Sequence, residues 1–306
     1  MNLTPSNQTN LYGLGNNLEL FISLYKKDKL PNKILLSGQK GIGKSTLAHH
    51  LINFILSENE DHPYDQSNFR INELNKSFKL VKNNVNPNFQ LVDIAPGTKS
   101  INIDQIRDLI KNINKSSLND KPKFILIDNT EFLNKNSINA LLKDLEEPTK
   151  NTFFILINNQ KKLLPTLTSR CINFNIHLSY SNSILVINKL LNEDIFHIIN
   201  DELIDHYFSP GNIYTLYNFA NSNNLDIKKT NLETFLKFII KNNFLKKETS
   251  LRYIFYNYIE LSLRNTSIKL KNNYYSYFTK KIDELKRFNL DEETFFIEFN
   301  DKILNG

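Results

Sequence analysis

The chain has 306 residues, of which 40% are apolar and 23% charged, proportions typical of a folded protein of two or three domains. Its net charge of +6 is modest for this length and permits contact with nucleic acid without indicating it. The single cysteine, Cys171, excludes a disulfide framework and a cysteine zinc site. No apolar run approaches the roughly 20 residues that cross a bilayer, and the N-terminus lacks a signal-peptide pattern. We therefore expect a cytoplasmic protein without a membrane partner.

The first two thirds of the chain alternate helix-like and strand-like segments. Apolar residues at helical spacing predict helices, and short apolar runs predict strands. Helices are expected at 17–27, 45–56, 103–113 and 137–147. Strands are expected at 33–37, 89–93, 123–128 and 152–158. The last two are continuous apolar runs, which suit central strands of a parallel sheet, so the pattern predicts an α/β domain.

Two further regions have a different character. Residues 58–76 are polar and irregular, which predicts a surface loop or insertion. Beyond about residue 178 the apolar stripes have helical spacing throughout, interrupted at SPG (209–211). The aromatic residues of this region are expected to form the core of a helical bundle.

Residues 37–46 read SGQKGIGKST and contain the spacing G-x-x-x-x-G-K-S between a predicted strand and a predicted helix. Glycines in such a loop let backbone N–H groups wrap phosphates, and the helix N-terminus favours their negative charge. Lys44 would reach the β and γ phosphates of ATP, and the Ser45 hydroxyl would hold Mg²⁺. The alternative is a tight turn with an exposed lysine. The predicted nucleotide contacts are Gly38, Gly41, Gly43, Lys44, Ser45 and Thr46.

Asp128 ends the apolar strand predicted at 123–128. An aspartate at this place holds the magnesium ion of a nucleotide, directly or through water. Ser45 and Asp128 are therefore the expected magnesium ligands. The alternative is an aspartate that caps the strand at a turn.

Four further segments are more specific together than any single pattern: IDQIRDLI, FILIDNTEFL, INALLKDLEEP and LLPTLTSRC. They resemble the delta-prime subunits of bacterial DNA polymerase III clamp loaders, within the AAA+ clamp-loader family, over about residues 10–175. The resemblance implies an α/β AAA+ P-loop domain at 1–177, a parallel sheet flanked by helices. It further implies a small helical lid domain at 178–225 and an all-α C-terminal oligomerisation (collar) domain at 226–306.

The resemblance also assigns two residues. Arg170, in the Ser-Arg-Cys segment, matches an arginine finger that acts in trans on the ATP site of a neighbouring subunit. A planar cation there stabilises charge on the transferred phosphoryl group, an effect typically worth about 10³ to 10⁵ in rate. The alternative is a surface arginine at a strand start. Asn158 matches the residue that senses the γ phosphate, although it could equally satisfy its own backbone.

The chain departs from an ATPase of this family at two positions. Asn129 stands where motor subunits carry the catalytic glutamate, and an amide cannot act as the positioned base that is typically worth about 10² to 10⁴ in rate. Glu131 lies two residues further on. Asn212 stands where a second sensing arginine is expected in the lid. The four-cysteine zinc module of the family is also absent, so no zinc site is expected.

These features predict a stator subunit of a hetero-oligomeric clamp loader in DNA replication, part of a DNA-directed DNA polymerase holoenzyme by resemblance. It would bind ATP and Mg²⁺, hydrolyse ATP poorly and donate Arg170 to a neighbour. The resemblance implies motor gamma/tau and delta subunits, the sliding clamp and primed DNA as partners. The alternative is a hydrolysis-competent AAA+ ATPase, either a motor clamp-loader subunit or a helicase-loader-like protein. A sequence-specific DNA-binding regulator has little support, because no recognition-helix signature is present.

Overall fold

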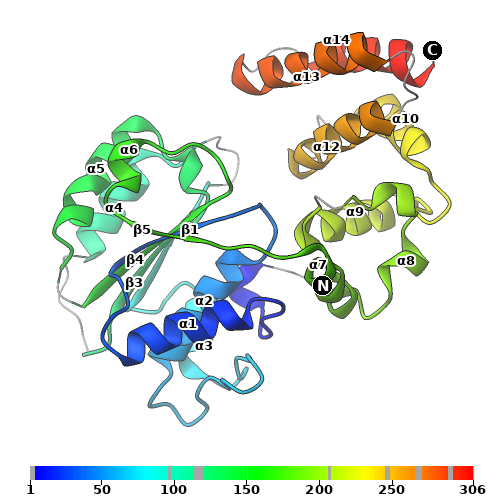
Figure 1. The fold of residues 1–306 in the computed structure, drawn as a ribbon. Coiled ribbons are helices and arrows are strands. Elements are labelled where there is room, and N and C mark those ends of the chain that lie inside the picture. Colours follow the sequence, from blue (N-terminus) through cyan, green and yellow to red (C-terminus); the bar gives the residue numbers. More distant parts are fainter. Residues whose placement is uncertain are drawn as a thin grey trace. The chain divides into compact units, whose positions relative to one another are not determined.

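The computed structural model divides into two compact units, residues 1–182 and 183–306, which are described separately (Figure 1). The structure describes residues 4–305 with the exception of 96, 97, 99, 114–119, 150, 206, 207, 245–248, 266–270 and 289–291.

The first unit is built on a five-stranded sheet in the order β2-β3-β4-β1-β5. Its strands are β1 (Lys33–Ser37), β2 (Phe89–Val92), β3 (Lys123–Ile127), β4 (Thr152–Asn158) and β5 (Ile172–Asn175). All neighbouring strands run parallel, so their carboxyl ends meet at one edge of the sheet. The four predicted strands form within one residue of their expected ends. The fifth, β5, is a short, largely exposed edge strand without the apolar run of the others.

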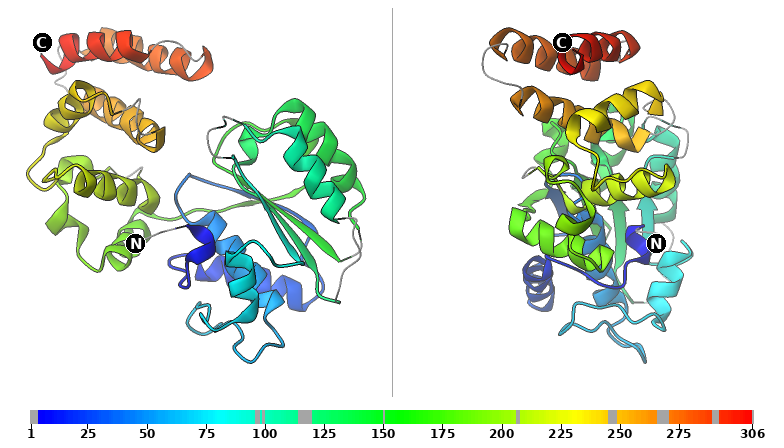
Figure 2. Two further views of the ribbon diagram at one scale, coloured as in Figure 1. Left: turned by 180° about the vertical axis from the view of Figure 1, so that it is seen from behind. Right: turned by 90° about the vertical axis from the view of Figure 1, so that its right-hand side faces the viewer.

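Helices cover both faces of this sheet (Figures 1 and 2). The helices of the unit are α1 (Gly15–Lys26), α2 (Lys44–Leu56), α3 (Lys76–Lys82), α4 (Ile103–Ile113), α5 (Lys135–Glu146) and α6 (Pro165–Thr168), with short 3₁₀ helices at Pro5–Asn7 and Thr130–Phe132. Alternate residues of a strand point to opposite faces. Leu35 and Leu156 accordingly join the core under α4 and α5, whereas Leu36 and Ile155 line a small apolar space with α1 and α2 residues. The predicted AAA+ P-loop fold is confirmed.

The second unit is all-helical. It contains α7 (Tyr180–Leu191, which begins in the first unit), α8 (Ile195–Ile198), α9 (Pro210–Ser222), α10 (Leu232–Lys241), α12 (Thr249–Asn265), α13 (Lys271–Phe288) and α14 (Glu292–Phe299), with a 3₁₀ turn at Asp201–Leu203 and a π turn at Asn300–Leu304. The stripe Leu232, Phe235, Leu236 and Ile239 is buried as its spacing predicts. Tyr258 is fully buried and donates its hydroxyl to the carbonyl of Leu203 at 2.8 Å.

One continuous cluster of buried side chains runs through this unit from Ile187 to Leu304. The division of the helical part into a lid and a collar near residue 225 therefore stays a prediction. Among the helices that the structure describes, none has the length and apolar character needed to span a membrane.

Candidate nucleotide-binding site

The turn from β1 into α2 is built around glycine. Gly38 donates its backbone N–H to the carbonyl of Asn158 at 3.2 Å, which ties the start of the turn to β4. A Cβ atom on Gly38 would lie 2.3 Å from the carbonyl oxygen of Ile176, so only glycine fits there. Gly41 and Gly43 have φ values of 85° and 96°, in the left-handed region that glycine adopts at little cost. The loop enters α2 at its N-terminus, where the helix dipole favours anions.

Lys44 is the first residue of α2, and its side chain turns back into the loop. It is only 3% exposed, so it is not the exposed lysine of a simple turn. Its ammonium group donates to the carbonyl oxygens of Gly38 at 2.8 Å and Gln39 at 2.6 Å, and to Oδ1 of Asn159 at 3.0 Å. Burial lowers the pKa of Lys44 to about 8, although the carboxylates of Asp128 and Glu131 act in the opposite direction.

Ser45 and Asp128 meet beside this lysine. Asp128 follows β3, and its carboxylate accepts a hydrogen bond from the Ser45 side chain and one from the backbone N–H of Asn129 at 2.8 Å. Burial raises the pKa of Asp128, and the nearby charge of Asp93 adds to the effect. A hydroxyl and a carboxylate are oxygen ligands of the kind that Mg²⁺ prefers, so the pair fits the ion that accompanies ATP. Thr46, the next helix residue, is half-buried.

The Asn129 side chain connects Asp93 and Asn159 through its amide group, which has no useful basicity. Its backbone is left-handed, with φ 52° and ψ 45°, a region that asparagine tolerates better than most residues. Its Nδ2 donates to Oδ1 of Asp93 at 2.8 Å, and its Oδ1 accepts from Nδ2 of Asn159 at 2.9 Å. Both carboxylate oxygens of Glu131 also contact Asn159, through Nδ2 at 2.9 Å and the backbone N–H at 3.3 Å.

Asn158 and Asn159 lie at the end of β4 but make different contacts. Asn158 is 7% exposed and closes the following turn: its Nδ2 donates to the carbonyl of Lys161, and its Oδ1 accepts from the N–H of Lys161. Asn159 is the amide that reaches Lys44. The contact with a phosphate expected for Asn158 stays a prediction, while the structure places its neighbour closer to the lysine of the loop.

Arg170 lies between α6 and β5, with its side chain 29% exposed. Its Nε and Nη2 donate to Oε1 of Glu146, at the end of α5, and its Nη1 donates to the carbonyl of Thr166 at 2.7 Å. The arginine of the Ser-Arg-Cys segment is therefore paired with the first glutamate of the ALLKDLEEP segment. Burial raises the pKa of the adjacent Cys171 thiol to about 11, which makes it a poor nucleophile.

Asn212 belongs to the first turn of α9 in the second unit. Its backbone N–H donates to the side chain of Ser209, the N-cap of that helix. The side chain is 5% exposed, and its Nδ2 has no hydrogen-bond partner among the residues that the structure describes.

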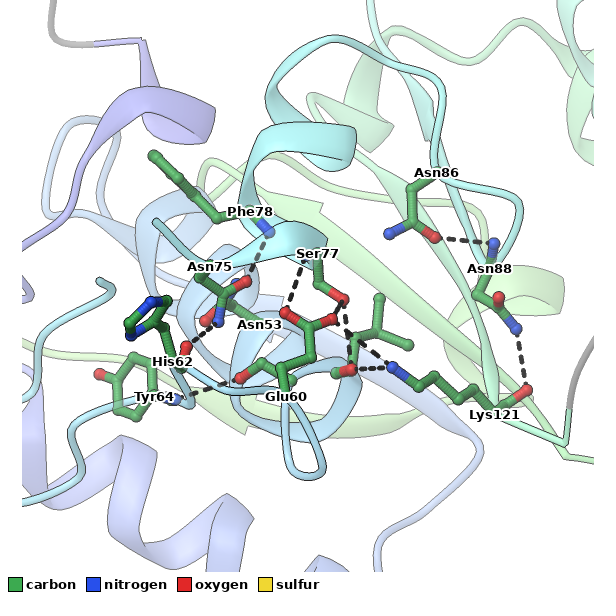
Figure 3. Close-up of polar contacts among 12 residues, drawn as sticks. Asn53, Glu60, His62, Tyr64, Asn75, Ser77, Phe78, Asn86, Asn88 and Lys121 are labelled. Atoms are coloured by element: carbon green, nitrogen blue, oxygen red, sulfur yellow. Dashed lines mark hydrogen bonds and ion pairs between the residues drawn. The ribbon is translucent and has the colours of Figure 1, made fainter. Parts of the chain in front are cut away.

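Hydrogen bonds fix the loop at 57–75, where the family's zinc module would lie (Figure 3). Asn75 is fully buried. Its Oδ1 accepts from Nδ2 of Asn53 at 3.2 Å and from the N–H of Phe78 at 2.7 Å, and its Nδ2 donates to the carbonyl of His62 at 2.9 Å. No cluster of three or more His, Cys, Asp or Glu side chains suited to a metal occurs in the described part of the chain.

The two histidines of α2 have no metal-like surroundings either. His50 is buried between the Tyr64 hydroxyl, 2.8 Å from its Nδ1, and the carbonyl of Gln8, 3.1 Å from its Nε2. His49 packs against the Phe89 ring, and burial lowers its pKa to about 4. Both therefore act as neutral core residues.

Residues 14–179 match the family model described as DNA polymerase III, delta subunit. This segment is more than half of the chain. The chain belongs to this family. Among curated proteins, the DNA polymerase III subunit delta′ of Pseudomonas aeruginosa is 34% identical over 45% of this chain and 40% of that protein. The Bacillus subtilis subunit delta′ is 31% identical over 50% and 44%, and a Buchnera aphidicola subunit gamma is 29% identical over 72% and 56%.

The matched segment therefore spans between 40% and 56% of the length of these curated relatives. Two solved structures from Thermotoga maritima are also similar. A DNA polymerase III gamma subunit-related protein has a TM-score of 0.38 and 17% identity over 94% of this chain and 92% of that chain. The RuvB Holliday junction branch migration motor has a TM-score of 0.43 and 15% identity over 78% and 81%. At these scores they add nothing to the family assignment.

Asp93 and Asn159 lie outside every motif of the site, and Glu146 lies in the INALLKDLEEP segment without any sign of its partner. Asp93 and Asn159 follow strands β2 and β4, and in a parallel sheet such positions converge at one edge with Asp128. The repeated amide in INNQ (157–160) is a sign that either asparagine could face the loop. Glu146 lies in a predicted helix, and its pairing with Arg170 depends on how α5 and α6 pack.

Proposed function

We propose that this chain is a delta-prime-like stator subunit of a DNA polymerase III clamp loader. It binds ATP and Mg²⁺ at the loop, turns ATP over poorly, and donates Arg170 to the site of a neighbouring subunit. The observation that carries the proposal is a contrast within one site. Lys44 and the Ser45–Asp128 pair have the chemistry of phosphate and magnesium binding. The residue after Asp128, in contrast, is Asn129, an amide whose two ends are hydrogen-bonded to Asp93 and Asn159.

The binding half of the proposal rests on charge and donors. The Lys44 ammonium carries a positive charge and the N-terminus of α2 a partial positive charge, so both attract the phosphate groups of a nucleotide. Ser45 and Asp128 supply two oxygen ligands for the ion that neutralises the remaining phosphate charge. When bound, Mg²⁺ would polarise the phosphoryl oxygens.

Poor turnover follows from the lack of a free base. The Asn129 amide has no useful basicity. Glu131 is a carboxylate in the right region, but its oxygens accept two hydrogen bonds from Asn159. Each oxygen of Glu131 is thus already engaged by Asn159 and is not a free base in this arrangement.

The trans role of Arg170 is compatible with its local contacts. Its partner Glu146 has a half-exposed side chain, and exposed ion pairs are typically worth only about 0–1 kcal/mol. A neighbouring phosphate could therefore compete for the guanidinium, which suits phosphoryl oxygens through its planar fork of donors. In this proposal residues 178–225 form the lid and 226–306 form the collar of a cytoplasmic hetero-oligomer with gamma/tau, delta, the clamp and primed DNA.

Steady-state ATP hydrolysis tests the proposal, first on the chain alone and then on the loader reconstituted with sliding clamp and primed DNA. We expect the isolated chain to hydrolyse almost no ATP. We expect Arg170→Ala to slow hydrolysis by the assembly by about a thousandfold or more, within the range typical of arginine fingers. Arg107→Ala is the matched control, because Arg107 is an exposed arginine of the same unit paired with Asp104. Equal rates for the two variants would rule out the finger.

The alternative, a hydrolysis-competent ATPase, is favoured by one observation: Glu131 lies close enough to Lys44 to act on its charge. A motor-like rate from the isolated chain that is lost in Glu131→Gln would establish this alternative. The stator proposal would then be abandoned.

A further inference from the structure

Each hydrogen of the Lys44 ammonium group has an acceptor within the protein. An ammonium has three donors, and three acceptors surround it: the carbonyls of Gly38 and Gln39 and Oδ1 of Asn159. Two of these acceptors belong to the loop itself. The third is held on a separate segment, after β4.

The orientation of the Asn159 amide is fixed by its neighbours. Lys44 can only donate and the Glu131 carboxylate can only accept, so Oδ1 must face the lysine and Nδ2 the glutamate. The second Nδ2 hydrogen is taken by Oδ1 of Asn129, whose own Nδ2 is bonded to Asp93. Asn159 thus has no donor left for a phosphate, and its oxygen is anchored through two further side chains.

A phosphate chain must change this arrangement. To contact both the β and γ phosphates, Lys44 has to turn two of its three hydrogens toward phosphate oxygens, so at most one present acceptor is kept. Gly38 and Gln39 are joined to Lys44 by the loop and can move with it, whereas Asn159 is fixed from another element. The contact with Asn159 is therefore among those that binding gives up.

We propose that Asn159 is a positioning residue that holds Lys44 against the carbonyls of Gly38 and Gln39 and thereby weakens the affinity of the loop for nucleoside polyphosphates. This inference rests on the proposed nucleotide binding and adds a residue that lowers it. Asn159 would not contact the phosphate; it acts through Lys44.

The test is a double-mutant cycle on nucleotide affinity, measured by calorimetry with ATP and Mg²⁺ on the full chain. We expect Asn159→Ala to tighten binding by about tenfold, a low value for one hydrogen bond to a charged group. In a Lys44→Met background the same change should have no effect. Asn173→Ala is the matched control, because this exposed asparagine of the same unit bonds to Asn175 at the sheet edge.

Weaker binding in Asn159→Ala would mean that the amide contacts the phosphate, and an unchanged affinity would mean that it does not restrain Lys44; either overturns the inference. An equal gain in the Lys44→Met background would also do so. If neither the wild type nor any variant binds nucleotide, the proposed binding itself fails.

In that case the positioning role is decided without nucleotide, by NMR measurement of hydrogen exchange between the Lys44 ammonium group and water. An ammonium hydrogen that loses its acceptor exchanges faster, so Asn159→Ala should speed this exchange and Asn173→Ala should not. Equal exchange rates in the two variants would refute the contact.

Discussion

The affinity of the loop for ATP should fall as pH rises through 8, because Lys44 loses its charge there. Burial lowers the pKa of this lysine to about 8. Phosphate stabilises the ammonium, so a proton is taken up on binding above that pKa. With one such group, the apparent dissociation constant scales with one plus the ratio of neutral to charged lysine. It should therefore rise roughly tenfold between pH 7 and pH 9.

Calorimetry or a fluorescent ATP analogue, in buffers of constant ionic strength, would measure this dependence. The phosphate itself titrates near pH 6, so it contributes little over this range. Lys44→Arg is the control, since arginine keeps its charge at every pH used and should give a flat profile. If the wild-type profile is also flat up to pH 9, Lys44 has an ordinary pKa. Burial would then not be the dominant influence on its ammonium group.

Three further outcomes follow from the structure. Gly38→Ala forces a Cβ against the Ile176 carbonyl and should destabilise the first unit by about 1–3 kcal/mol in urea unfolding, unlike Gly211→Ala in the first turn of α9. Glu146→Gln should release Arg170 from its ion pair and raise ATP hydrolysis by the assembled loader about two- to fivefold, which corresponds to the free energy of an exposed ion pair. Glu147→Gln is the control, and a fall in rate would contradict the finger. Asn75→Ala removes three buried hydrogen bonds and should lower the unfolding free energy by about 2–4 kcal/mol, against about 1 kcal/mol for the exposed helix cap in Asn134→Ala; equal losses would refute the role given to the buried loop network.

The sheet could be predicted from the sequence because its strands are buried on both faces. The runs at 33–37, 123–127 and 152–158 are apolar at nearly every position, and such runs between helical segments are typical of the central strands of a parallel sheet. The strand Ile172–Asn175 could not be found in this way. It lies at the sheet edge, its side chains are mostly exposed, and pairing with β1 alone makes it a strand.

The residues of the site also fall into two groups, those that the sequence locates and those that it does not. The glycines and Lys44 are fixed by local backbone geometry, so a linear pattern is enough to locate them. The contacts of Asn159 and Glu146 depend on which side chains meet across the sheet edge or between helices, and a single sequence does not contain that information. Asn158 and Asn159 are identical residues one position apart, yet the first closes the turn to Lys161 and the second contacts Lys44, a difference that the sequence does not contain.

The backbone conformation and the hydrogen-bond partners of Asn129 suit an amide side chain. The left-handed backbone there favours asparagine over glutamate. Its donor faces the Asp93 carboxylate at 2.8 Å, where a glutamate would place two negative charges side by side. Its acceptor orients Asn159, which in turn holds both Lys44 and Glu131. In the proposed function, the residue that stands in place of the catalytic base is thus also the one that anchors the restraint on the lysine, so the proposed weak binding and slow turnover would share one structural origin at Asn129.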